Sequence, residues 1–132
     1  MDPTKLNDKE KLVTLFAGLS DDNSGSRGIE RKILPSLIFL IEKDVNDSFL
    51  YNFNVRTNPF SDDLEEDLDD LLRAQLLEMR STITITTLGM EWYNSFGENA
   101  SCFLDKIKEI LGKLANTSYS GLQELVYLKL TK

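Results

Sequence analysis

Seven carboxylates lie between Asp62 and Asp70, and no basic residue interrupts them. Acidic side chains at this density can hold a hard cation such as Mg²⁺, or they can attract a basic protein. Cation sites in proteins use ligands that converge from several segments, whereas these carboxylates are expected to line one convex helix face. The sequence therefore predicts no metal site, and it favours a charged surface that meets a protein partner.

Few other side chains could do chemistry. The chain contains no histidine, which excludes Ser-His and Cys-His nucleophile pairs and every zinc site that needs imidazole. Its single cysteine cannot form an internal disulfide or a thiolate metal centre. Neither a P-loop nor a Gly-x-Gly-x-x-Gly fingerprint occurs. We therefore predict a non-enzymatic protein without catalytic residues or cofactors.

The carboxylates belong to a predicted amphipathic helix at Ser61–Leu77. Ser61 can cap its first turn, and leucines at helical spacing form the opposite stripe. A β-hairpin is expected next, with strands at 76–79 and 82–86 around an Arg80-Ser81 turn. Thr87 is then expected to cap a fourth helix.

Two helices are expected before the acidic one. Asn7 and Glu10 have the spacing of a capping box, which opens the first helix. The second helix is predicted at 29–44, with a break or kink near Pro35 because proline removes an interior hydrogen bond. In the alternative, a short turn ends at Leu34 and Pro35 occupies the first helical turn.

Alternating apolar residues at 49–55 predict a half-buried strand, which Asn58-Pro59 would stop. After the fourth helix, apolar spacing predicts further helices over about 100–130. The last of these could instead be a strand, because Val126, Leu128 and Leu130 alternate.

Three pieces of the chain carry a resemblance: 58–64 (NPFSDDL), 71–78 (LLRAQLLE) and 83–89 (ITITTLG). They resemble segments of small prokaryotic winged helix-turn-helix proteins, most closely YwgA-like proteins and Panacea-type antitoxin domains. The likeness covers about residues 29–95, and Gln75 departs from it because a glycine commonly ends the third helix there. It implies a mainly α fold with a small antiparallel β wing (α+β), extended by C-terminal helices within one domain spanning 1–132. It also implies binding rather than catalysis.

DNA binding is the function that a winged helix suggests, but the charge opposes it. The net charge is −7, and without the seven carboxylates acids and bases would number 15 each. Two unit charges 4 Å apart interact by about 1 kcal/mol in water and about 4 kcal/mol at an effective dielectric of 20. An acidic third helix would therefore repel phosphates. We predict that it docks a basic protein partner through a set of five carboxylates: Asp62, Asp63, Glu66, Asp67 and Asp70.

The alternative is a dimeric transcriptional regulator that contacts DNA outside the third helix. Its candidate DNA-binding residues are basic: Arg27, Arg31, Lys32 and Arg80. A homodimer seam is expected on the later helix, at its apolar stripe: Ile107, Ile110, Leu111 and Leu114.

Most aromatic residues in the middle of the chain are expected in the core. One left exposed beside the acidic helix would add an apolar anchor to the charged surface. No run of 18 apolar residues occurs, and the first residues are too polar for a signal peptide. We therefore expect a cytoplasmic protein that does not enter a membrane.

Overall fold

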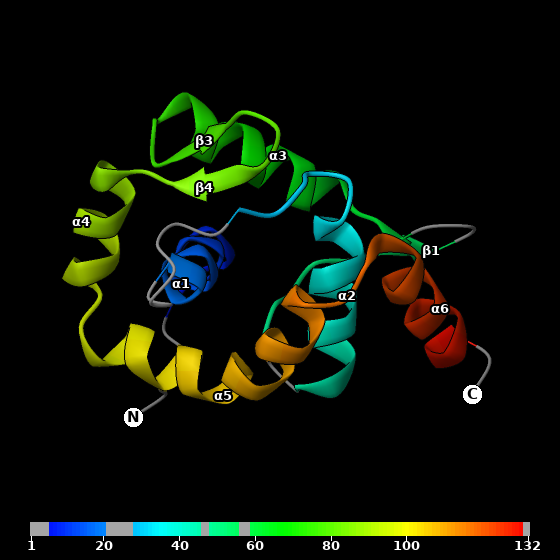
Figure 1. Cartoon of the computed structure of the whole chain (residues 1–132). Coiled ribbons are helices and arrows are strands. Elements are labelled where there is room, and N and C mark those ends of the chain that lie inside the picture. Colours follow the sequence, from blue (N-terminus) through cyan, green and yellow to red (C-terminus); the bar gives the residue numbers. More distant parts are fainter. Residues whose placement is uncertain (1–5, 21–27, 46–47, 56–58, 131–132) are drawn as a thin grey trace.

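A computed structural model describes residues 6–20, 28–45, 48–55 and 59–130 (Figure 1). The elements follow in the order α1 (Asp8–Ser20), α2 (Leu34–Asp44), β1 (Asn54–Val55), β2 (Pro59–Phe60), α3 (Asp62–Arg73), β3 (Leu77–Met79), β4 (Ile83–Ile85), α4 (Thr87–Ser95), α5 (Glu98–Ala115) and α6 (Tyr119–Leu130). The fold is mainly helical with a small antiparallel hairpin, as the sequence predicted.

α1 lies at the centre of the molecule, in contact with α3, β4, α4 and α5 (Figure 1). The predicted capping box is confirmed. The Glu10 N–H donates to Asn7 Oδ1 at 2.8 Å, and the Asn7 N–H donates to Glu10 Oε1 at 2.9 Å. These two bonds satisfy backbone donors at the helix start, and Leu12, Leu15 and Phe16 are then fully buried.

α2 begins at Leu34 rather than at residue 29, so Pro35 occupies the first helical turn, where its missing N–H is not needed. The helix predicted from residue 29 is therefore wrong over 29–33, and the alternative, a short turn that ends at Leu34 with Pro35 in the first helical turn, is confirmed. Ile29 instead forms an antiparallel bridge with Ile83 of β4, with N–H···O distances of 3.0 and 2.8 Å. β4 is thus flanked by β3 on one side and by this bridge on the other.

The strand predicted at 49–55 is mostly unpaired. Phe49 and Tyr51 are buried while Leu50 is exposed, so the predicted alternation of burial is confirmed. Only Asn54–Val55 pairs, and its partner is Pro59–Phe60, where the strand was expected to have ended. The alternation arose because the segment packs its aromatic side chains inward without a neighbouring strand.

α3 begins as predicted, with Ser61 Oγ accepting the Leu64 N–H at 3.3 Å. It ends at Arg73, four residues before the predicted end at Leu77. The cause is a C-terminal turn in which the Leu76 N–H donates to the Leu71 carbonyl at 3.0 Å, and the Gln75 N–H donates to the Leu72 carbonyl at 3.1 Å. Gln75 has a φ of 64°, the left-handed conformation that this turn requires.

The predicted hairpin is confirmed, with Leu77 opposite Ile85 and Met79 opposite Ile83. α4 is capped by Thr86, one residue before the predicted cap, and its Oγ1 accepts the Gly89 N–H at 3.0 Å. A Cβ on Gly89 would lie 2.2 Å from the Leu76 carbonyl oxygen. Only glycine therefore lets α4 start this close to the hairpin.

α5 and α6 complete the fold. Gly97, with a φ of 62°, turns the chain from α4 into α5. The segment 119–130, which could have been a helix or a strand, is helical, and it packs on α2 (Figure 1). None of the helices in the described part of the chain is long and apolar enough to cross a membrane.

Candidate functional site

The two faces of α3 differ sharply in burial. Leu64, Leu68 and Leu71 are at most 1% exposed, and they anchor the helix to the core. The seven carboxylates occupy the remaining circumference, with three in the first turn: Asp62, Asp63 and Glu65. Carboxylates there interact favourably with the positive end of the helix dipole. The leucines thus bury one face of the helix, and the carboxylates line the other side, where they can make contacts.

Arg31 neutralises one flank of α3. Its guanidinium donates to Glu65 Oε1 at 3.0 Å and to Asp69 Oδ1 at 2.8 Å. The Arg31 side chain is 27% exposed, so this contact is partly shielded from water. Because Arg31 lies just before α2, its two contacts connect the start of α2 to α3. These two carboxylates are therefore engaged within the chain.

The opposite flank is engaged as well. Asp70 pairs with Lys9 of α1 at 2.8 Å and with Arg73 one turn later. Hydrogen bonds from Lys9 and then Arg73 lower the pKa of Asp70, and the same contact raises the pKa of Lys9. Asp67 Oδ2 accepts the Tyr51 hydroxyl at 2.7 Å. Of the five carboxylates predicted to dock a partner, Asp67 and Asp70 thus have partners inside the molecule.

Asp62, Asp63 and Glu66 remain on the outer surface of α3. All three are exposed, and none forms a hydrogen bond or ion pair with the residues that the structure describes. Phe60, immediately before the helix cap, is 50% exposed. An exposed aromatic ring therefore lies two and three residues before Asp62 and Asp63 in the chain, which is the anchor-plus-charge combination that the sequence left open.

A second group of charges, which sequence reasoning missed, surrounds Tyr51. Glu42 Oε1 accepts the Tyr51 backbone N–H at 2.9 Å, and burial raises the pKa of Glu42 to about 7. Burial likewise raises the pKa of Asp8, against the opposing hydrogen bond from the Leu50 N–H. Lys11, only 3% exposed, has its Nζ 5.7 Å from the Phe103 ring centroid. The sequence signal that could have identified this group is Glu42, a carboxylate placed directly after the apolar run of α2.

The predicted DNA-binding residues do not form a free basic surface. Arg31 is held by α3, as described above. Lys32 lies 3.5 Å from Glu30 and 5.1 Å from the Tyr119 ring centroid, and Arg80 lies 3.6 Å from Glu78. Arg27 lies outside the described residues. Each described candidate base therefore faces a carboxylate of its own chain.

The predicted dimer seam is wrong in its residues. Ile107, Leu111 and Leu114 are at most 4% exposed, because α5 turns this stripe toward α1 and α2 of the same chain. Ile110 is partly buried. Ile107, Leu111 and Leu114 are therefore core residues that cannot meet a second copy, and only Ile110 of the predicted seam keeps exposed surface. Association of two copies stays a prediction.

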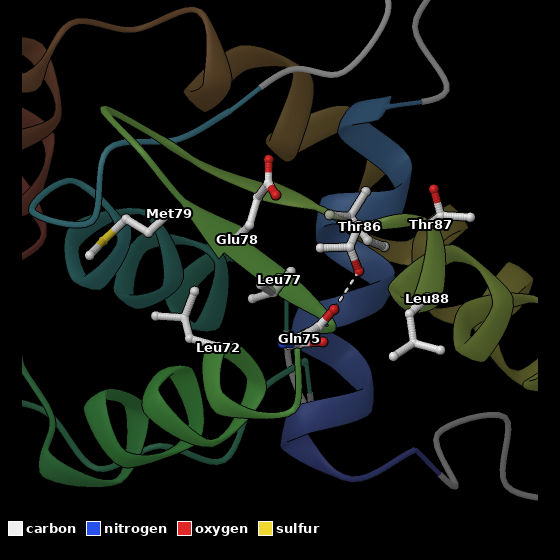
Figure 2. Close-up of a pocket in the computed structure, with 9 residues that line it drawn as sticks. Leu72, Gln75, Leu77, Glu78, Met79, Thr86, Thr87 and Leu88 are labelled. Carbon is white, nitrogen blue, oxygen red and sulfur yellow. Dashed lines mark hydrogen bonds between the residues drawn. The ribbon is translucent and has the colours of Figure 1, made fainter.

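A groove with a volume of about 880 Å³ opens where α3, the hairpin and α4 meet (Figure 2). It is lined by Leu72, Gln75, Leu77, Glu78, Met79, Ile85, Thr86, Thr87 and Leu88. Thr86 joins the three elements, since its Oγ1 lies 2.6 Å from the Gln75 carbonyl oxygen. Met79 and Leu88 are about half exposed, at 49% and 48%. The groove therefore presents apolar side chains at the C-terminal end of α3.

Comparisons with protein-family models, with curated proteins and with solved structures found no match for this chain. Within the described residues, no three Asp, Glu or Cys side chains are grouped so that they could hold a metal ion. The surface features that bear on function are three unpaired carboxylates and one exposed phenylalanine at α3, with a groove at the C-terminal end of that helix.

Proposed function

We propose that this protein is a non-enzymatic interaction module of the winged-helix type, and that α3 docks a basic protein partner. The order of elements supports the winged-helix part: α1, the Ile29 bridge, α2, α3 and then the hairpin that pairs with the bridge. A fold of this type hosts many functions, so the support for docking comes from the surface of α3.

One observation carries the proposal: Asp62, Asp63 and Glu66 are exposed and unpaired among the described residues, whereas the other four α3 carboxylates have intrachain partners. Three like charges on one surface attract lysine and arginine, and they speed association with a basic partner. Phe60 beside them offers an apolar contact that a purely ionic surface lacks.

The same geometry weighs against DNA as the ligand. A duplex brought against α3 would place phosphates beside carboxylates, at a cost of about 1 to 4 kcal/mol for each close pair. Binding through Arg31 would first require breaking its contacts with Glu65 and Asp69. Arg80, 84% exposed, is the more available base, but one base gives little affinity for DNA.

The test measures binding of two defined probes by fluorescence anisotropy. One is a labelled peptide of three central lysines between serines, Ser-Ser-Ser-Lys-Lys-Lys-Ser-Ser-Ser, and the other is a labelled 20-base-pair duplex. We expect the peptide to bind at low salt and to dissociate as salt rises, while the duplex does not bind. Replacing two of the carboxylates, Asp63→Lys with Glu66→Lys, should weaken peptide binding about tenfold.

The matched control is Asp105→Lys with Glu109→Lys, which changes the net charge equally on the exposed face of α5. If both double variants weaken the peptide equally, the effect comes from overall charge and the docking face is not α3. Duplex binding that is abolished by Arg31→Ala with Lys32→Ala would favour the regulator instead.

A further inference from the structure

Residues 48–53, which we call the strap, connect α2 to β1 without pairing to a neighbouring strand, since sheet pairing begins only at Asn54. Among the described residues, the strap makes one backbone–backbone hydrogen bond, from the Ser48 N–H to the Val45 carbonyl at 3.3 Å. A segment with so few backbone hydrogen bonds opens more readily than the helices around it. The strap is therefore held in place mainly by side chains.

The inner face of the strap is aromatic. Phe49 and Tyr51 are 4% and 6% exposed. The Phe49 ring meets Phe103 of α5 edge-on, with centroids 5.5 Å apart, and the Phe53 ring meets Phe39 of α2 in the same way at 5.6 Å. If the strap lifted from the helices, it would uncover these rings and bring apolar surface into water.

Carboxylates from three helices hold the strap at two adjacent residues. Asp8 Oδ1 of α1 accepts the Leu50 N–H at 3.2 Å, and Glu42 Oε1 of α2 accepts the Tyr51 N–H at 2.9 Å. Asp67 Oδ2 of α3 accepts the Tyr51 hydroxyl at 2.7 Å. A change of charge among these carboxylates therefore acts directly on the contacts that keep the strap closed.

Glu42 is the carboxyl of this group that changes charge near neutral pH. Burial raises the pKa of Glu42 to about 7, and the charge of Asp8 acts in the same direction. The Tyr51 N–H, Lys43 on the same helix and Lys11 of α1 oppose the rise without cancelling it. The closed strap therefore disfavours the ionised form of Glu42, because it keeps that carboxyl partly away from water and close to another carboxylate.

The other groups around the strap are engaged in different contacts. Burial and then the hydrogen bond to Asp67 raise the pKa of Tyr51, so its hydroxyl keeps the proton that it donates. Lys129 of α6 pairs with Asp44 at the end of α2, with a distance of 2.7 Å between Nζ and Oδ1. α5 presents the Phe103 ring to the strap. The group that links the strap to pH is therefore Glu42.

We propose that the strap is a pH-sensitive switch, closed while Glu42 is protonated and opened locally when Glu42 releases its proton to water. Opening returns Glu42 to water, separates Asp67 from Tyr51 and uncovers the aromatic rings. The sign follows from linkage: a carboxyl whose pKa is higher in the closed state stabilises that state at low pH, and this stabilisation is lost as pH rises toward 7. The inference does not depend on the docking function of α3.

The test is amide hydrogen exchange followed by NMR between pH 5 and pH 8, with each rate corrected for the intrinsic exchange rate at that pH. The Tyr51 amide reports on the strap, and the amides of Leu15 and Phe16 in the middle of α1 report on unfolding of the whole domain. We expect Tyr51 to show the larger opening constant. That constant should rise about tenfold from pH 5 and level off above about pH 7.

Three variants assign the effect to its residues. Glu42→Gln keeps an oxygen for the Tyr51 N–H but cannot ionise, so it should abolish the rise in the opening constant. The matched control, Asp44→Asn, removes a carboxylate from the same helix and should leave the rise unchanged. Asp8→Asn removes a like charge near Glu42, so the opening constant should level off at a lower pH than in the wild type.

Three results would overturn the proposal. If Tyr51 had the same opening constant as Leu15 and Phe16 at every pH, the strap would open only when the whole domain unfolds. A rise that persists in Glu42→Gln would mean that another group controls the strap. An unchanged profile in Asp8→Asn would mean that the carboxylate cluster does not set the pH of opening. The first comparison uses the wild-type protein alone, so it does not require any variant to fold.

Discussion

Carboxylates occupy two contrasting environments in this molecule. On the outer surface of α3, Asp62, Asp63 and Glu66 lie in water without partners among the described residues. Around Tyr51, Glu42 and Asp8 are half-buried, and this burial raises the pKa of each. Three carboxylates of the dense acidic run are thus left without partners among the described residues, whereas the isolated Glu42 is bound into the fold. The dense run of charges in the sequence therefore contains the accessible carboxylates, whereas the carboxylates whose pKa is raised by burial lie elsewhere in the fold.

The largest effect is expected at the centre of the buried group. Tyr51→Ala should lower the free energy of unfolding by about 3–5 kcal/mol, because it removes a buried ring stacked on Phe49. Tyr51→Phe keeps the ring and loses only the hydroxyl bond to Asp67, so it should cost about 1–2 kcal/mol. Urea denaturation measures both. If Tyr51→Phe were neutral, Asp67 would belong with the outer carboxylates.

The next effect is a pH dependence from Glu42. The pKa of Glu42 is about 7 in the folded protein, against an ordinary value of 4.5 that applies to the unfolded chain. Between these two pH values the folded protein holds a proton that the unfolded chain releases. Stability must therefore fall as pH rises from about 4.5 to 7. The full shift corresponds to about 3 kcal/mol, and solvent screening of this partly exposed group reduces the expectation to about 1–2 kcal/mol.

Glu42→Gln tests this directly, because its amide oxygen can still accept the Tyr51 N–H. Unfolding free energies at pH 5 and pH 7.5 should differ in the wild type and be nearly equal in the variant. A residual slope at lower pH is expected from Asp8, whose pKa is raised in the same direction. An unchanged pH dependence in Glu42→Gln would assign the titration to another group.

A smaller effect separates the paired flank of α3 from its open surface. Arg31→Met should cost about 1 kcal/mol at low salt and less at high salt, since it breaks contacts with two carboxylates. The matched control, Arg80→Met, removes one long contact of a residue that is 84% exposed, and it should change stability by less than about 0.3 kcal/mol. Equal losses in both variants would mean that partial shielding of Arg31 contributes nothing.

The sequence predicted the elements better than their contacts. Local signals sufficed for the capping box at Asn7, the Ser61 cap and the hairpin, because each depends on residues close together in the chain. The Ile29–Ile83 bridge and the Arg31 contacts join segments that are distant in the sequence, so no local sequence pattern predicts them. The apolar stripe of α5 was assigned to a dimer because periodicity reveals a buried face without revealing what covers it.

The smallest effect on stability should come from the open surface itself. Asp62→Asn with Glu66→Gln removes a favourable interaction with the helix dipole, about 0.3–1 kcal/mol, and relieves a like-charge repulsion of about 0.2–0.5 kcal/mol. These terms nearly cancel, so urea denaturation should show a change below about 0.5 kcal/mol, while the same variant loses affinity for the lysine–serine peptide. Charges that matter for binding and not for folding are those of a recognition surface. A stability loss above about 1 kcal/mol would instead group these carboxylates with Asp67 and Asp70, as contacts that hold the helix in place.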